Sequence, residues 1–223
     1  MNATALVRAA LAGSGVELVA SCPIEDYDRA APEPVRSAAL FPGARGVVVV
    51  GSAGPDLWRR FDARARRDPA IWDAPHPYDA FVAESLGAAD RALAAAGVRA
   101  RRIDAAFHAT PRIDFVALAR LVGLGLPGPF FLAIHAEHGP WWALRAAWLV
   151  DAPVDPPLSP VPPCRGCAAP CVGGWQHAGG LVRASPEVRA ACVVGQGSRY
   201  DPDQIAYHYD REKTAARLRA RGG

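Results

Sequence analysis

Residues 123–155 (GLGLPGPFFLAIHAEHGPWWALRAAWLVDAPVD) decide the fold, because they hold two apolar runs on either side of a turn. The runs cover residues 130–134 and 142–150, and the turn falls at residues 137–140 (EHGP). Apolar runs of this length, separated by a turn that contains glycine, are typical of neighbouring antiparallel strands. The stretch therefore predicts a β-hairpin.

Polar and aromatic side chains surround this turn. His135 and His138, with Glu137 between them, are donors that could hold a metal ion. A structural zinc site commonly has four ligands and the loop offers three, so a mononuclear metal site is only an alternative here. Trp141 and Trp142 are expected in the core or along a groove, where their bulk would suit a large flat ligand.

Upstream, residues 46–51 (GVVVVG) form an unbroken β-branched run between two glycines. Such a run predicts a strand that is buried on both faces of a sheet. Residues 52–56 are then expected to turn the chain into a helix that carries Trp58 and Phe61. Neither a G-x-G-x-x-G pattern nor a Lys-Ser/Thr pair is present, so this turn is interpreted as structural rather than as a phosphate loop.

Apolar residues at helical spacing predict three further helices, over residues 3–12, 79–96 and 113–122. A glycine follows each of them at the position where a helix commonly ends. Short apolar runs at residues 16–20 and 98–103 predict two more strands.

The composition is that of a globular chain. Its 223 residues, 51% hydrophobic and 21% charged, suffice for one sizeable core and a small appendage. The basic residues are scattered arginines, with Lys213 the only lysine, and the net charge is +3, so nucleic-acid binding is not expected. No apolar run of about 18 residues occurs without a charge, so no membrane-spanning helix is expected.

Four of the five cysteines lie close together in the sequence, at Cys164, Cys167, Cys171 and Cys192. Grouped thiolates of this kind are ligands for zinc or for iron-sulfur clusters. The odd number of cysteines and the close trio do not fit a secreted disulfide framework, so we expect a reducing, cytoplasmic location. Cys22 stands apart and is expected to be a buried or free thiol.

The spacing favours a 4Fe-4S cluster. Two-cluster ferredoxins bind one cluster with three close cysteines and one remote cysteine, which matches the trio and Cys192. Trp175 stands where the next cysteine of such a pattern would be, so one of the two clusters has no ligands. Zinc, for which His177 could replace Cys192, and a site that binds nothing are the alternatives; zinc sites more often show two C-x2-C pairs.

Motifs in residues 46–209 resemble a known superfamily. Ile134-His135, Gly139-Pro140-Trp141 and Ala143-Leu144-Arg145 follow one another, and residues 199–207 read RYDPDQIAY. This order resembles epoxyqueuosine reductase and the cobalamin-processing protein cyanocobalamin decyanase, which has an I-H-P-x-x-G-x-W-x-x-x-R hairpin and an R-Y-x-x-x-Q-x-A-Y segment. Ala136 replaces the hairpin proline, and a tRNA substrate is not expected.

The resemblance implies an α+β fold. It divides the chain into a nitroreductase-like core, residues 1–155, and a small cysteine-rich, ferredoxin-like metal-binding segment with a C-terminal helix, residues 156–223. In these families the core holds a corrinoid in a wide cleft. The residues that would line this cleft here are Trp141, Arg145, Arg199 and Tyr200.

The resemblance also implies an iron-sulfur redox protein. It would bind or reduce a corrinoid (cobalamin) or a similar cofactor in a cleft beside a single 4Fe-4S cluster, as a cobalamin-linked oxidoreductase. Electrons would come from a donor of the flavodoxin or ferredoxin type. The alternatives are a ferredoxin-like electron carrier without corrinoid and a zinc-stapled interaction module. No catalytic residue and no oligomeric state follow from the sequence.

Overall fold

The computed structural model describes residues 2–106, 108–128, 132–172 and 185–221. Four antiparallel strands form the central sheet in the order β1-β2-β6-β3. Their bounds are β1 Leu18–Pro23, β2 Gly46–Ala53, β3 Ala100–Asp104 and β6 Trp142–Val150. A separate ribbon pairs β4 (Leu126–Pro127) with β5 (Ala133–Ile134).

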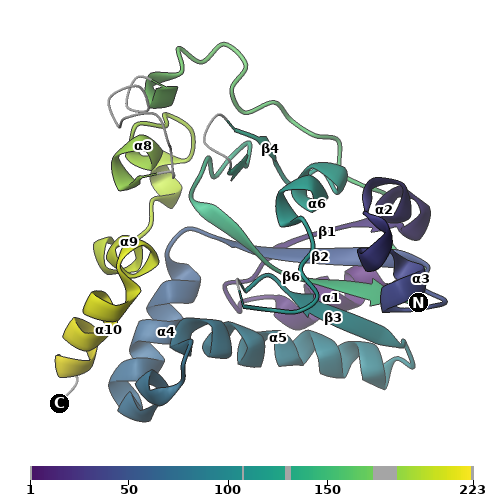
Figure 1. Cartoon of the computed structure of the whole chain (residues 1–223), viewed down its shortest axis with the longest axis horizontal. Coiled ribbons are helices and arrows are strands. Elements are labelled where there is room, and N and C mark those ends of the chain that lie inside the picture. The colour runs from purple at the N-terminus through teal and green to yellow at the C-terminus, as the bar shows by residue number, and fades with distance from the viewer. Residues whose placement is uncertain (1, 107, 129–131, 173–184, 222–223) are drawn as a thin grey trace.

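Helices cover both faces of the sheet (Figure 1). They are α1 Ala3–Leu11, α2 Ile24–Ala30, α3 Ser37–Leu40, α4 Asp56–Arg67, α5 Pro77–Ala95, α6 Phe115–Leu121, α8 Pro186–Ala190, α9 Pro202–Tyr209 and α10 Arg211–Ala220. In Figure 1, α5 runs below the sheet, α2 and α6 lie above it, and α9 and α10 stand at the end away from the N-terminus. The predicted α+β class is confirmed.

The valines of β2 explain why this strand lies inside the sheet. Val48 and Val50 belong to a core shared with α1, α4 and α5, which we call the α5 core. Val47 and Val49 belong to a core shared with α2 and α6, the α6 core. All four side chains are fully buried, and each contributes roughly 1.5–3 kcal/mol by its burial. The predicted strand that is buried on both faces is confirmed.

Aromatic rings at the junction of α4, α5 and α9 close one end of the α5 core. The ring of Trp58 lies 5.2 Å from Phe61, 5.4 Å from Tyr78 and 5.1 Å from Tyr207. Leu218 of α10 is buried in the same core. The C-terminal helices therefore pack directly on the body of the chain. The proposed division at residues 155 and 156 stays a prediction.

Local signals set the ends of the predicted helices. The side chain of Asn2 accepts a hydrogen bond from the backbone N–H of Ala5, 3.1 Å away, at the start of α1. Asp114 accepts two bonds of 2.9 Å from backbone N–H groups at the start of α6. Gly97 follows α5 with a φ of 72°, the left-handed conformation that commonly ends a helix. All the helices expected from periodicity are present, with ends shifted by at most two residues.

The predicted hairpin is wrong for the described residues. Strand β6 pairs with β2 and β3, whereas Ala133–Ile134 pairs with β4. A single bridge between His135 and Gly139 closes the turn. The reason lies in β6, whose second half is buried on both faces and therefore takes a central place in the sheet. Residues 130 and 131 of the expected first strand lie outside the described residues.

Within the described residues, no helix combines the length and the apolar character needed to cross a membrane.

Candidate functional site

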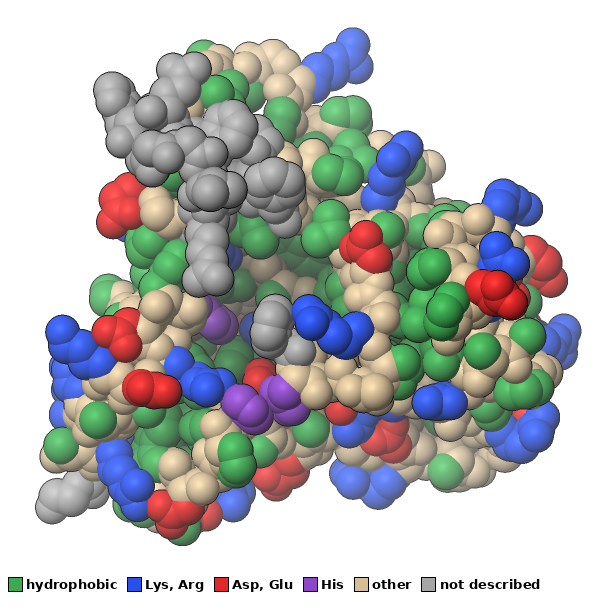
Figure 2. Space-filling model, in the orientation of Figure 1, with side chains coloured by type: hydrophobic (Ala, Val, Ile, Leu, Met, Phe, Trp, Pro, Cys, Tyr) green, Lys and Arg blue, Asp and Glu red, His purple; other side chains and the backbone are tan. Residues whose placement is uncertain are grey.

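A cavity of about 530 Å³ lies between the start of α5, β3 and β6. Charged and imidazole side chains line it, among them His76, Asp79, Arg102, His108 and Arg145. Figure 2 shows histidine, arginine and aspartate side chains at the rim of a hollow on this face. The volume falls within the range of about 300–1,000 Å³ that is usual for ligand pockets.

Arg145 reaches this cavity because of a β-bulge. The register of β6 against β2 shifts between Val50, which faces Ala146, and Gly51, which faces Leu144. Arg145 is thus the extra residue, with no partner on β2, and a bulge of this kind changes the direction of a side chain. Its Nε donates to Ser52 Oγ at 2.8 Å and its Nη2 to Tyr78 Oη at 3.2 Å.

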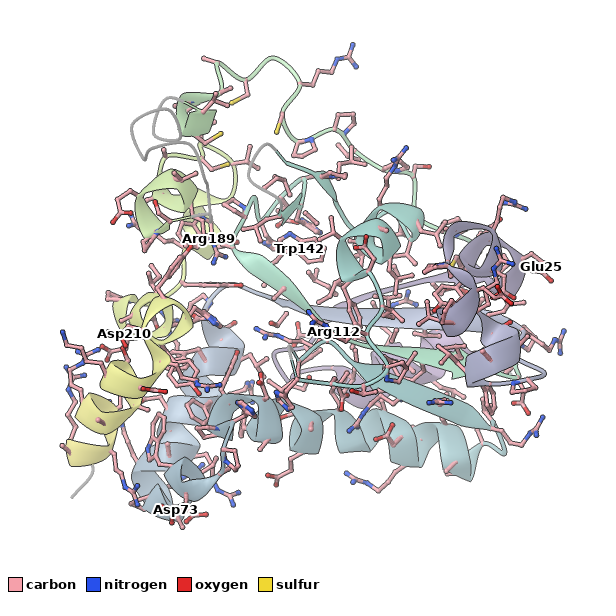
Figure 3. All side chains as sticks on the ribbon, viewed as in Figure 1. Glu25, Asp73, Arg112, Trp142, Arg189 and Asp210 are labelled. Atoms are coloured by element: carbon pink, nitrogen blue, oxygen red, sulfur yellow. The ribbon has the colours of Figure 1, made fainter. Side chains whose placement is uncertain are left out.

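A second group of side chains gathers around Trp141, which is fully buried. The guanidinium carbon of Arg189 lies 5.0 Å from the ring centroid of Trp141 and 5.0 Å from that of Tyr200. Arg199 lies 5.7 Å from the Trp141 ring. Figure 3 shows Arg189 at the base of α8, on the side toward β6. Three of the four predicted cleft residues, Trp141, Arg199 and Tyr200, therefore lie in contact.

His208 of α9 connects this group with Arg145. Its ring centroid lies 5.7 Å from that of Tyr200 and 6.0 Å from that of Tyr78, whose hydroxyl contacts Arg145. The side chain keeps contact with solvent, but the surrounding protein and the charges of Arg145 and Arg189 lower the pKa of His208. The imidazole is therefore neutral at pH 7 and able to donate or accept a hydrogen bond.

Several buried polar atoms of this region have no hydrogen-bond partner among the described residues. They are Trp141 Nε1, Arg189 Nε, Tyr200 Oη and Gln204 Oε1. Leaving such an atom unpaired costs about 1–3 kcal/mol, so native proteins rarely keep several together. In addition, neither Arg145 nor Arg189 has a carboxylate within 4 Å in the described part of the chain. The four unpaired atoms are themselves buried, so a ligand would reach them only if the side chains around them moved, whereas Arg145 lines the cavity directly.

His135, Glu137 and His138 do not form a metal site in the turn at residues 135–139. The Nδ1 atom of His135 accepts backbone N–H groups of Glu137 at 3.1 Å and His138 at 3.2 Å, and this stabilises the turn. Burial, together with the neighbouring His138, lowers the pKa of His135 to about 4. In the described residues these three side chains do not bring their ligand atoms together. His135 is therefore interpreted as a hydrogen-bonded residue of the turn and not as a metal ligand.

The four cysteines of the predicted metal site are free thiols. Cys171 and Cys192 are buried, Cys167 is half-buried and Cys164 is exposed. Burial raises the pKa of Cys192, and the nearby Cys171, Cys164 and Cys167 raise it further, although the backbone of Val194 opposes the change. The thiols of the two distant sequence segments are therefore close enough to repel one another as thiolates, a repulsion that a bound cation would reverse.

The chemistry of this thiol set fits a metal centre. The backbone N–H of Ala169 donates to Cys167 Sγ at 3.3 Å, as expected for a turn that presents sulfur ligands. Among the described residues, no three cysteines bring their sulfur atoms together as His76, Asp79 and His108 bring their ligand atoms. Both zinc and an iron-sulfur cluster accept a set of four thiolates. Trp175 and His177 lie outside the described residues.

Sequence reasoning missed two features of this region. Arg189 belongs to no motif, and only its burial beside Trp141 and Tyr200 reveals it. His108 is a surface histidine whose ring stacks on that of His76, with centroids 3.9 Å apart, and no sequence pattern joins the two residues. The one available signal was the pair His76 and Asp79, which is spaced by one helical turn at the start of α5. Cys22, as expected, is a buried free thiol.

The chain is similar to known proteins in structure but not in sequence. No protein-family model matches the chain, and no curated protein matches it either. The solved structure of CblC, a B12-trafficking protein of C. elegans and homologue of human MMACHC, superposes with a TM-score of 0.65 at 14% identity. The match covers 97% of this chain and 95% of that protein.

Epoxyqueuosine reductases are also similar in structure. The Streptococcus thermophilus enzyme superposes with a TM-score of 0.56 at 13% identity, over 88% of this chain and 55% of the enzyme. An epoxyqueuosine reductase bound to a tRNA stem loop gives 0.52 at 17% identity, over 76% of this chain and 50% of the enzyme. The chain thus spans about half the length of these reductases. The resemblance inferred from the motifs is confirmed, and the chain has the fold of CblC and of the matching half of the epoxyqueuosine reductases.

Proposed function

We propose that this chain is an iron-sulfur redox protein that binds a corrinoid of the cobalamin class in the cleft formed by the cavity and the Trp141 region. The end-to-end likeness of its fold to a B12-trafficking protein carries the proposal. The cavity of about 530 Å³, which Arg145 lines, supports it. Corrinoids carry amide side chains around a wide ring, and such amides could pair with the guanidinium of Arg145.

The residues of the cleft would act by binding and orientation. Arg145 is held by Ser52 and Tyr78, so its remaining N–H groups keep a fixed direction. Arg189 donates to the carbonyl oxygen of Pro140 at 2.5 Å, which fixes it beside Trp141. His208 can form a hydrogen bond without adding charge. These groups would hold a large polar cofactor and exclude water from its buried side.

The cysteine segment, residues 156–223 in our division of the chain, would hold the redox centre through Cys164, Cys167, Cys171 and Cys192. When bound, a 4Fe-4S cluster supplies electrons one at a time, and a corrinoid supplies the cobalt ion that takes them up. The cysteine segment packs on the body of the chain, since Ile134 shares a small core with Cys171 and Val188, and this contact supports a centre close to the cleft. An oxidoreductase activity fed by a flavodoxin-type or ferredoxin-type donor would follow.

Two spectroscopic measurements test this function. Protein purified without oxygen should be brown, and iron analysis should give about four irons per chain. Titration with hydroxocobalamin should then shift the corrinoid absorption bands. A colourless protein that contains zinc would contradict the cluster, and unchanged corrinoid bands would contradict the cofactor and leave an electron carrier.

A pair of arginine variants locates the corrinoid. Arg199→Ala removes an exposed guanidinium beside Trp141 and should weaken corrinoid binding about tenfold, equivalent to about 1.4 kcal/mol. Arg66→Ala removes an equal charge from α4, where Arg66 pairs with Asp62, and should leave binding unchanged. Equal affinities of the two variants would place the corrinoid elsewhere.

A further inference from the structure

We propose that His76, Asp79 and His108 form a binding site for a divalent transition-metal ion that keeps open coordination positions toward the cavity. The three side chains converge from the start of α5 and from the loop after β3. One ligand atom from each lies within 4.8 Å of the others. The three residues line the cavity proposed for the corrinoid, but none of them is among the side chains named above as holding it.

The distances suit ligands of one ion better than a hydrogen-bonded pair. His108 Nδ1 and Asp79 Oδ2 are 3.7 Å apart, which is beyond hydrogen-bond length. Two ligand atoms that each lie about 2.1 Å from a tetrahedral zinc ion are about 3.4 Å apart. A shift of a few tenths of an ångström would therefore seat both atoms on an ion. The rings of His76 and His108, now stacked at 3.9 Å, would rotate to direct their nitrogens inward.

The donor set indicates which ions would bind. Two imidazoles and one carboxylate are preferred by zinc, cobalt, nickel and ferrous iron, whereas magnesium and calcium prefer oxygen ligands alone. Three protein ligands leave at least one coordination position for water or for a small molecule. All three residues line the cavity of about 530 Å³, so a ligand on the open position would have room there.

Arg211 competes for one of the ligand atoms. Its Nη1 donates to His76 Nδ1 at 2.5 Å and so uses the lone pair that an ion would need if it bound there. Arg211 is an exposed side chain of α10, so its guanidinium can move into solvent. Removal of Arg211 takes away both the hydrogen bond that occupies His76 and a nearby positive charge. We therefore expect the ion to bind more tightly in a variant without Arg211. A cluster of surface histidines without a metal site would give no such response.

Cobalt(II) is the probe, because its visible spectrum reports the ligand type. Titration of the full-length protein should show one cobalt ion with a spectrum of nitrogen and oxygen ligands, separate from any cobalt that the four cysteines bind. His108→Ala, a change on an exposed loop that spares the core, should weaken binding by about 10-fold to 100-fold. Arg211→Ala should tighten it by about fivefold, as expected for removal of a neighbouring charge at the surface.

Matched controls separate the site from general charge effects. Asp79→Asn should weaken binding, while Asp73→Asn, a change at an exposed aspartate that pairs with Arg219, should alter affinity less than about twofold. Arg217→Ala removes an equal charge from α10 but from a side chain paired with Asp203, and should have no effect. Sulfur-to-cobalt charge-transfer bands alone, or equal affinities of His108→Ala, Arg211→Ala and the unmodified protein, would overturn the proposal.

Discussion

Gly139 and Gly195 meet backbone to backbone, and neither position has room for a side chain. A Cβ atom on Gly195 would overlap the carbonyl group of His138, and one on Gly139 would overlap that of Val194. Both residues also have positive φ angles, 57° and 73°. This contact joins the turn before β6 to the loop that follows Cys192, so it fixes the cysteine segment against the body of the chain.

Gly195→Ala should therefore destabilise the protein. The substitution forces an overlap and a left-handed backbone on alanine, which costs about 1–3 kcal/mol, or roughly 3–10 °C in Tm for a chain of this size. Gly197→Ala is the matched control, because a Cβ there meets nothing within 4 Å. Thermal unfolding followed by circular dichroism checks the pair. Equal Tm values for the two variants would show that this contact does not hold the segment.

Acid should weaken the fold through His135. Its pKa is lowered to about 4 in the native state, whereas an unfolded histidine titrates near 6.5. The unfolded chain therefore binds the proton first, and stability falls as the pH drops from about 6.5 to about 4. Since the ring is half-buried, we expect a loss of about 1–2 kcal/mol.

His135→Asn isolates this effect, because asparagine can still accept the backbone N–H groups in the turn but does not titrate. Urea unfolding at pH 7 and pH 4.5 should show a smaller loss for the variant than for the unmodified protein. Parallel losses in both proteins would assign the acid sensitivity to other groups.

Cys192→Ala should abolish cluster binding. The variant removes the ligand that comes from the distant part of the sequence, and iron content should fall from about four atoms per chain to below one. Cys22→Ala is the control, since Cys22 lies in the α6 core, where burial raises its thiol pKa to about 12. Iron retained in Cys192→Ala would show that the cluster has another fourth ligand.

Arg189→Lys should destabilise the Trp141 region although the charge is kept. Lysine cannot lie flat against the rings of Trp141 and Tyr200 while also donating to Pro140, so a buried charge would lose its contacts. We expect a loss of about 1–3 kcal/mol in the free energy of unfolding, measured with urea. Arg67→Lys on the exposed side of α4 should stay within about 0.5 kcal/mol, and a similar value for Arg189→Lys would contradict the role given to its planar group.

The sequence was sufficient to predict most of the elements. Four consecutive valines can only be buried on both faces, so β2 was identified without knowledge of its neighbours. The pairing of the strands could not be predicted. The turn at residues 137–140 suggested a local hairpin, but β6 pairs with strands about 45 and 95 residues away in the sequence, and no local pattern encodes such pairing.

The residues of the candidate site also fall into two groups, those that belong to sequence motifs and those that carry no sequence signal. Trp141, Arg199 and Tyr200 were named because they belong to motifs; the structure brings them into contact, and their role in binding stays a prediction. His76 and His108 could not be joined, since 32 residues separate them and their contact depends on how the loop after β3 folds back over α5. Arg189 carries no sequence signal at all, because an arginine in a short helix is ordinarily exposed.

The bulge at Arg145 has a consequence for how β6 can vary in length. From Ala146 onward, the even-numbered side chains Trp148 and Val150 point into the α5 core, but before the bulge the even-numbered Trp142 lies in the α6 core. The one additional residue reverses the parity of the strand. Deletion of a single residue between positions 143 and 145 would therefore turn Trp142 to the opposite face of the sheet and remove the guanidinium from the cavity in one step. Relatives of this protein should tolerate substitutions along β6 far better than a change in its number of residues.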